Sequence, residues 1–137
     1  MKNIFFIAAI ALQMSCSKSG DGPTPTPTPT TSETNIAFGI DIDPGSNSIY
    51  AALSSSQSIQ VNISSTMPKN GVTIDLTTKN DLTNSVVSST SISSSSSNNK
   101  LSIDNLQAGI LCTTTITVTS KKLANNLQIK SFKIAKK

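Results

Sequence analysis

The sequence contains no histidine, no arginine and no tryptophan, and all 11 of its basic residues are lysine. Without histidine, the chain lacks the commonest general base and the commonest transition-metal ligand. Without arginine, it lacks the side chain that binds carboxylates and phosphates through two parallel hydrogen bonds. Serine is abundant, but no serine lies in a G-x-S-x-G motif, and no histidine can activate one. We therefore expect no enzymatic activity and no cofactor, with an unspecified serine–lysine pair as the catalytic alternative.

Aromatic residues are also scarce, at 4% of the chain. Sites for single-stranded nucleic acid stack bases on aromatic rings, so the scarcity argues against a nucleic-acid partner. It also counts against a sugar site built on an aromatic platform, because Tyr50 is the one polar aromatic residue. Recognition of a glycan by polar loops remains open.

The N-terminus carries an export pattern. Lys2 precedes an unbroken apolar run over residues 4–12, which is too short to span a bilayer, and small or polar residues then lead to Cys16. This pattern resembles a bacterial lipoprotein signal peptide of the signal peptidase II type. Ser15 fits the small residue before the cysteine, whereas Gln13 stands where an apolar residue is usual. A plain secretory signal with an incidental cysteine is the alternative.

The lipoprotein resemblance implies that residues 1–15 are removed and that lipid is attached to Cys16, as a diacylglyceryl thioether and an amide-linked fatty acid such as palmitate. The membrane would then be a partner through this anchor. Ser17 follows the cysteine where an aspartate would favour retention in the inner membrane, so the resemblance implies the outer membrane, with the domain periplasmic or surface-exposed. Lipidation leaves Cys112 unpaired, and a Cys16–Cys112 disulfide is the rival interpretation.

A linker is expected over residues 16–34. Proline alternates with threonine from Pro23 onward, which fixes φ and removes backbone donors. Such a tract favours extended polyproline II and does not pack as a helix or a central strand. We expect a disordered, semi-rigid spacer between the lipid and a folded domain.

Residues 35–137 are expected to form one all-β domain. Apolar residues alternate with polar ones over residues 36–42, 59–63, 72–76 and 110–118, and weaker strands are expected over residues 48–53, 84–90, 100–104 and 126–135. The last of these changes parity, which predicts a bulge near Lys130 and Ser131. The polar tract over residues 88–99 is expected to be a mobile loop. Seven or eight short strands indicate an antiparallel two-sheet sandwich.

One segment carries a family resemblance. Residues 101–119 resemble the E–F corner of fibronectin type III and related immunoglobulin-like domains, with Leu106 and Gly109 at matching positions. Cys112 stands where the family has its corner tyrosine, and Ala108 replaces a proline. The resemblance implies an immunoglobulin-like β-sandwich. Cys112 is then expected to face the core as an inert thiol.

Two candidate binding features remain. Asp41 and Asp43 lie in a turn that offers oxygen ligands for Ca²⁺, although no distal glutamate follows, so a solvent-facing turn is the preferred interpretation. Six lysines gather toward the C-terminus and could meet anionic lipid or polysaccharide, although solubilising lysines that block edge-strand pairing are the preferred interpretation. These lysines are Lys121, Lys122, Lys130, Lys133, Lys136 and Lys137.

Taken together, these patterns predict a lipid-anchored protein of the cell envelope. Its β-sandwich is expected to serve adhesion on the cell surface or an accessory role in an envelope complex, with envelope proteins or polysaccharide as partners. A glycan-binding module on the cell surface is the alternative function.

Overall fold

The computed structural model describes residues 32–42, 44 and 48–137. The predicted signal peptide, Cys16, most of the linker and Asp43 lie outside these residues. Within the described ranges, every regular element is a β-strand, as the alternating patterns predict. No helix in this part of the chain has the length and apolar character needed to cross a membrane.

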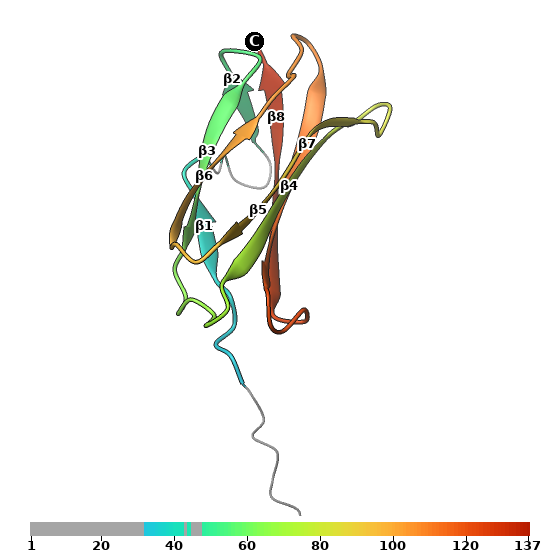
Figure 1. The fold of residues 1–137 in the computed structure, drawn as a ribbon. Helices are drawn as coiled ribbons and strands as arrows, with labels where there is room; N and C mark the ends of the chain where they lie inside the picture. The colour runs from blue at the N-terminus through green and yellow to red at the C-terminus, as the bar shows by residue number, and fades with distance from the viewer. Residues whose placement is uncertain (1–31, 43, 45–47) are drawn as a thin grey trace, which may run out of the picture. The chain divides into compact units, whose positions relative to one another are not determined.

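The described residues contain eight strands in two sheets (Figure 1). The three-stranded sheet has the order β1-β3-β6, and the five-stranded sheet has the order β2-β8-β7-β4-β5. The strands are β1 (Phe38–Ile40), β2 (Ile49–Ala52), β3 (Gln57–Ile63), β4 (Val72–Asn80), β5 (Val86–Ser94), β6 (Asn98–Ile103), β7 (Leu111–Ser120) and β8 (Leu127–Lys136).

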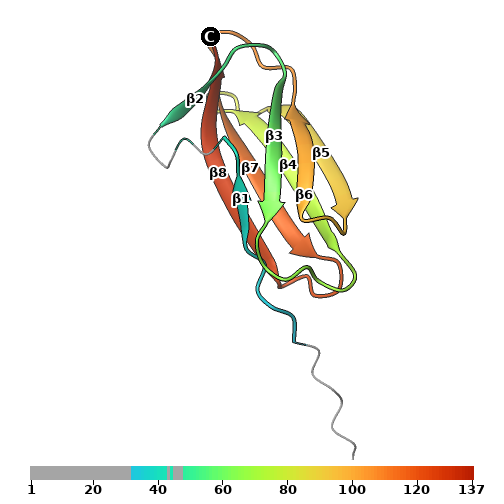
Figure 2. The same ribbon diagram turned by 90° about the vertical axis from the view of Figure 1, so that its left-hand side faces the viewer.

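The two sheets pack face to face as a sandwich, as Figure 2 shows. Alternate residues of each strand point into the space between the sheets, because successive side chains in a strand lie on opposite faces. The core is mainly aliphatic: Ile59, Val61 and Ile103 come from the three-stranded sheet, and Ile74 and Ile116 from the five-stranded sheet, all fully buried. Burial of these branched side chains is the main force that holds the sheets together.

The prediction of a wholly antiparallel sandwich was wrong at one strand. β2 pairs in parallel with β8, with Tyr50 opposite Ile134. β1 belongs to the other sheet, where it pairs antiparallel with β3. The chain therefore changes sheet between β1 and β2. β2 lies at the edge of the five-stranded sheet, parallel to β8.

The predicted mobile loop over residues 88–99 was also wrong. Most of this serine-rich tract forms the end of β5 and the start of β6, and residues 95–97 connect the two strands. Pairing with β4 requires backbone groups rather than apolar side chains, so a polar sequence can form this edge strand. Alternation is nevertheless present, because Ser88, Thr90 and Ile92 face inward opposite Thr78, Leu76 and Ile74.

The predicted bulge in β8 is absent from the described structure. The β7–β8 register runs without a shift from Leu111 opposite Ala135 to Thr119 opposite Leu127. The change of parity instead reflects apolar residues that point outward. Ile129 and Leu127 are 54% and 45% exposed, whereas Phe132 is buried. The register shift lies instead in the β4–β5 pair, between Thr78 and Lys79.

Polar side chains occupy the inner face of β8 where apolar ones were expected. The Gln128 Oε1 atom accepts a hydrogen bond from the backbone N of Phe38 at 3.0 Å, and the Lys130 Nζ atom lies 5.8 Å from the centroid of the Phe38 ring. The Asn126 Oδ1 atom similarly accepts from the backbone N of Ile36 at 2.9 Å. These contacts join β1 and the residues before it to β8 and the residue before it, and so connect the two sheets.

Candidate functional site

The outer face of the five-stranded sheet carries a regular array of hydroxyl groups, here called the hydroxyl face. It arises because every second residue of β7 from Thr113 to Thr119 is threonine, and these side chains point away from the core. β4, β5 and β8 place further hydroxyls beside them in register. The members of the face are Thr73, Thr77, Ser89, Ser91, Ser93, Thr113, Thr115, Thr117, Thr119 and Ser131.

Sheet geometry sets the spacing of this array. Neighbouring strands lie about 4.8 Å apart, and alternate residues along one strand lie about 6.8 Å apart. Ser131, Thr115, Thr77 and Ser89 form one row across four strands. The face therefore offers evenly spaced donors and acceptors on a rigid support. Asp75 interrupts the array, and its Oδ1 atom accepts a hydrogen bond from the Ser91 hydroxyl at 2.5 Å.

A polar hollow of about 790 Å³ lies at one end of the hydroxyl face. Three threonines of the face line it, together with Lys79, Lys133, Asp81, Asn80 and Asn84. These lining residues come from β4 and the β4–β5 turn, from β7 and from β8. The hollow combines two ammonium groups, one carboxylate, amides and hydroxyls, which are groups suited to a polar ligand.

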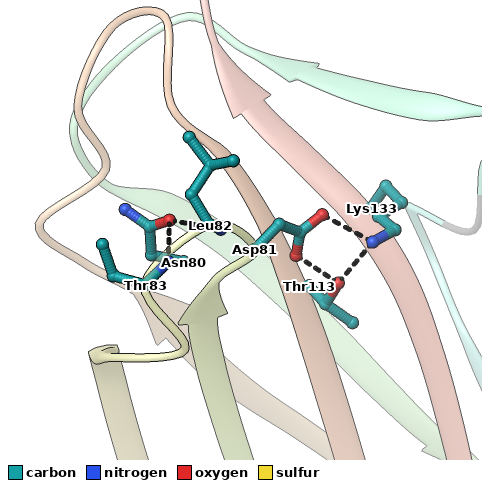
Figure 3. Close-up of polar contacts among 6 residues, drawn as sticks. All are labelled: Asn80, Asp81, Leu82, Thr83, Thr113 and Lys133. Carbon is teal, nitrogen blue, oxygen red and sulfur yellow. Dashed lines mark hydrogen bonds and ion pairs between the residues drawn. The ribbon is translucent and has the colours of Figure 1, made fainter.

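An ion pair with a bridging hydroxyl organises the hollow (Figure 3). The Lys133 Nζ atom lies 2.5 Å from Asp81 Oδ2 and donates to Thr113 Oγ1 at 2.8 Å. The Thr113 hydroxyl donates in turn to Asp81 Oδ1 at 2.6 Å. Hydrogen bonds from Lys133, and then from Thr113, hold the pKa of Asp81 below its ordinary value. Asp81 is therefore charged at neutral pH.

The hydroxyl beside Lys133 is not set up as a nucleophile. A lysine in a serine–lysine mechanism must accept a proton, and an ammonium group has no lone pair with which to do so. Lys133 is engaged as a cation with Asp81, and Thr113 donates its proton to the same carboxylate.

The hairpin tip positions Asp81. The Asn80 Oδ1 atom accepts hydrogen bonds from the backbone N of Leu82 at 2.8 Å and of Thr83 at 3.2 Å, which closes a tight turn (Figure 3). Asn84 adopts a φ of 57°, in the left-handed region that asparagine tolerates. The turn leaves Leu82 95% exposed at the tip. An apolar side chain therefore stands beside the polar hollow.

Cys112 lies beneath this hairpin and is a buried, free thiol, as expected. It faces inward from β7 opposite Asn80 of β4 and is 1% exposed. Burial raises the pKa of the Cys112 thiol, and the negative charge of Asp81 raises it further. A thiol of this kind packs as a small apolar group and reacts slowly.

Asp41 contacts the neighbouring strand. Its Oδ1 atom accepts a hydrogen bond from the backbone N of Gln60 at 2.8 Å, and its own backbone N donates to the Gln60 carbonyl at 3.2 Å. This arrangement extends the pairing of β1 with β3. Among the described residues, no three histidine, cysteine, aspartate or glutamate side chains gather as ligands for a metal ion.

The six C-terminal lysines do not form one patch. Lys133 lies in the hollow, and Lys130 lies on the inner side of β8 over Phe38. Lys121 and Lys122 follow β7, at one end of β8, whereas Lys136 ends β8 and precedes Lys137. A strand of ten residues is about 34 Å long, so these two groups of lysines lie far apart.

Sequence reasoning missed the hollow and the hydroxyl face. The four alternate threonines of β7 were visible, but the pattern was used only to identify the buried face of the strand. Lys79 and Asp81 gave no signal, because only the pairing of β4 with β7 brings them beside Thr113.

The sequence matches no model of a known protein family. It also has no significant match among curated proteins.

Proposed function

We propose that this chain is a lipid-anchored lipoprotein of the cell envelope that presents a non-catalytic, immunoglobulin-like β-sandwich for adhesion or for an accessory role in an envelope complex. The anchor rests on the apolar run over residues 4–12 and on Cys16. The outer membrane is the proposed location, on the basis of Ser17. The alternating prolines supply a spacer between lipid and domain.

The strand order supports the immunoglobulin-like assignment. If β3, β4, β6, β7 and β8 are strands B, C, E, F and G, then B and E share one sheet while C, F and G share the other, as in that fold. The segment with Leu106, Gly109 and Cys112 then runs from strand E into strand F, which is the place its sequence resemblance implies.

The hydroxyl face is the feature of the structure that supports the proposed recognition role. It is broad and solvent-facing, it stands on a rigid sheet, and it ends in a hollow that contains both signs of charge. Its hydroxyls can donate and accept hydrogen bonds without any covalent step. A surface of this kind suits a partner that is bound by many polar contacts.

Capture from native envelopes tests this role. The intact protein would be cross-linked in the membrane and recovered as the native chain and as two variants, Thr117→Lys on the hydroxyl face and Gln60→Lys on the outer face of the three-stranded sheet. Both positions point outward from the middle of a strand. We expect a protein or glycan partner with the native chain and with Gln60→Lys, and its loss with Thr117→Lys. Recovery of no partner, or equal recovery with both variants, would contradict the proposal.

The hollow favours one second candidate, a glycan-binding module. Lys79 and Lys133 flank Thr113 in a single row across three strands, so one cation lies on each side of a hydroxyl. An acidic sugar could be bound there by charge and by the amides of Asn80 and Asn84.

A glycan array tests this candidate, with and without Ca²⁺, using the native chain, Lys79→Gln and the control Lys69→Gln. Lys69 lies in the turn before β4, away from the hollow. Binding of acidic glycans that falls only in Lys79→Gln would support the candidate. The absence of any bound glycan would remove it.

A further inference from the structure

The described strands leave four sheet edges, and these edges differ in how they are protected. β1 and β2 are short, with three and four residues, and β6 carries Lys100 in its middle. Short strands and edge lysines are common ways to prevent an edge from pairing with another chain. β5 has neither protection: it has nine residues, and none of them is charged or proline. Among the described edge strands, β5 is therefore the one protected neither by short length nor by a charged residue.

Part of this edge is already covered by the connection from β6 to β7. The backbone N of Asp104 donates to Ser88 Oγ at 3.1 Å, and the Asn105 amide donates to the Val87 carbonyl at 3.4 Å. At the other end of the strand, the Ser94 hydroxyl accepts from the backbone N of Ser96 at 2.9 Å as the chain turns. The segment left open is residues 89–93.

The space beside the open segment is hollow. A depression of about 580 Å³ lies between β5 and β6, with Thr90, Lys100 and Ser102 among its lining residues. The edge of β5 therefore faces this depression instead of packing against β6 along its whole length. An extended strand can approach the open segment from this side.

We propose that a second copy of this chain pairs with β5 in the antiparallel direction and continues the five-stranded sheet across two molecules. Two-fold symmetry places the same segment on both sides of such an interface. If the pairing is centred on Ser91, Ser89 of each copy lies opposite Ser93 of the other. Every residue in residues 89–93 is serine, threonine or isoleucine, so the paired residues themselves carry no like charges.

The distribution of charge favours a second copy as the occupant. The chain has a net charge of +4, which opposes self-association in general. However, the lysines on and beside β8 are separated from β5 by β7 and β4. Pairing through β5 places these lysines at the two outer ends of the joined sheet. β5 itself carries no charged group that would attract a strongly charged peptide, and Lys100 is the one charged residue that lines the depression beside it.

The pairing also extends the hydroxyl face. Because Ser91 points outward in both copies, the outer faces of the two sheets lie on the same side of the joined sheet. Two hydroxyl faces then form one surface. Five paired residues per strand make a small interface, so we expect a weak and concentration-dependent dimer in solution.

Sedimentation of the intact chain in density-matched detergent tests the pairing. The test variant is Ser89→Lys with Ser93→Lys, which places lysines opposite each other across the proposed interface. The control is Ile129→Lys with Ser131→Lys, at exposed outward positions of β8 inside the sheet. We expect a mass that rises toward a dimer with concentration, a dimerisation constant weakened at least about ten-fold in the test variant, and little change in the control.

Disulfide trapping supplies a second readout that does not depend on affinity. Ser91→Cys should form a covalent dimer under mild oxidation, whereas Ser131→Cys should not form one faster than the native chain, which contains the same Cys16 and Cys112. A chain that stays monomeric at every concentration, or a dimer that the β5 lysines do not weaken, would overturn the proposal. Protection of β5 amides that appears only with added envelope extract would identify a heterologous strand and would also overturn it.

Discussion

Replacing Thr78 with valine should destabilise the domain, although valine has nearly the same shape. Thr78 and Thr114 are completely buried between the sheets, and their hydroxyl oxygens lie 2.8 Å apart. This hydrogen bond joins β4 to β7 at adjacent positions of the sheet. Removal of one hydroxyl leaves the other inside an aliphatic core without its partner.

The size of the effect follows from the asymmetry of buried hydrogen bonds. A buried polar group left without a partner costs about 1–3 kcal/mol, whereas replacement of both partners by apolar groups of the same shape is nearly neutral. Thr78→Val and Thr114→Val should therefore each lower the free energy of unfolding by about 1–3 kcal/mol. In a domain of roughly 100 residues, each 1 kcal/mol shifts Tm by about 4–8 °C. The double variant should unfold near the native temperature.

Urea and thermal unfolding of the four proteins measure the double-mutant cycle. The expected coupling between the two positions is about 2 kcal/mol or more, the sum of the two single losses, and its sign makes the double variant more stable than the single changes together predict. Two single losses that simply add in the double variant, or single variants with native stability, would refute the buried pair.

Three further predictions concern the turn before β4, the hollow and the buried thiol. Gly71→Ala should destabilise the domain by more than about 2 kcal/mol, because its φ is 76° and the new Cβ would collide with the backbone carbonyl oxygen of Ser94. Gly109→Ala, with a φ of 74° and open space around the new Cβ, should cost only about 1 kcal/mol. Equal losses in urea unfolding would contradict this. Asp81→Asn should cost up to about 1 kcal/mol at pH 7. The folded pKa of Asp81 is lowered, so its stabilisation exists above the unfolded pKa and is lost as pH falls through the folded one; a difference from the native chain that persists at pH 2 would count against the ion pair. Cys112 should react with a thiol reagent only at the rate of unfolding, and fast labelling of the folded chain would disprove its burial.

Much of the fold could be predicted because one face of most strands is buried. The period of two over residues 59–63 and 110–118 places Ile59, Val61, Ile116 and Val118 in the core, as observed. The prediction failed where backbone hydrogen bonds within the sheet hold a strand that has few apolar side chains. The serine-rich β5 is held by backbone pairing with β4, and polar composition alone resembles a loop.

The change of parity in β8 shows a second limit. Alternation assumes that apolar residues point inward, yet Leu127 and Ile129 point outward while Gln128 and Lys130 point toward β1. The contacts that make this arrangement favourable come from Phe38, which is 90 residues away from Gln128 in the chain. No local pattern contains that information.

The candidate site was less predictable than the fold. The hollow joins Asp81 of the hairpin tip to Thr113 and Lys133 on two other strands, at sequence separations of 32 and 52. The lysines were noticed as a group along the chain, but strand geometry separates them. The register of β4, β7 and β8 decides which of these charges meet.

The intact mass of the protein extracted from native membranes tests most directly the claim that lipid on Cys16 anchors this domain to the membrane. We predict a chain that begins at Cys16 and carries the added mass of a diacylglyceryl group and of a fatty acid on the new amino group. Any linker glycosylation would appear as a further increment of mass. A chain with unmodified Cys16, whether or not residues 1–15 have been removed, would contradict the claim.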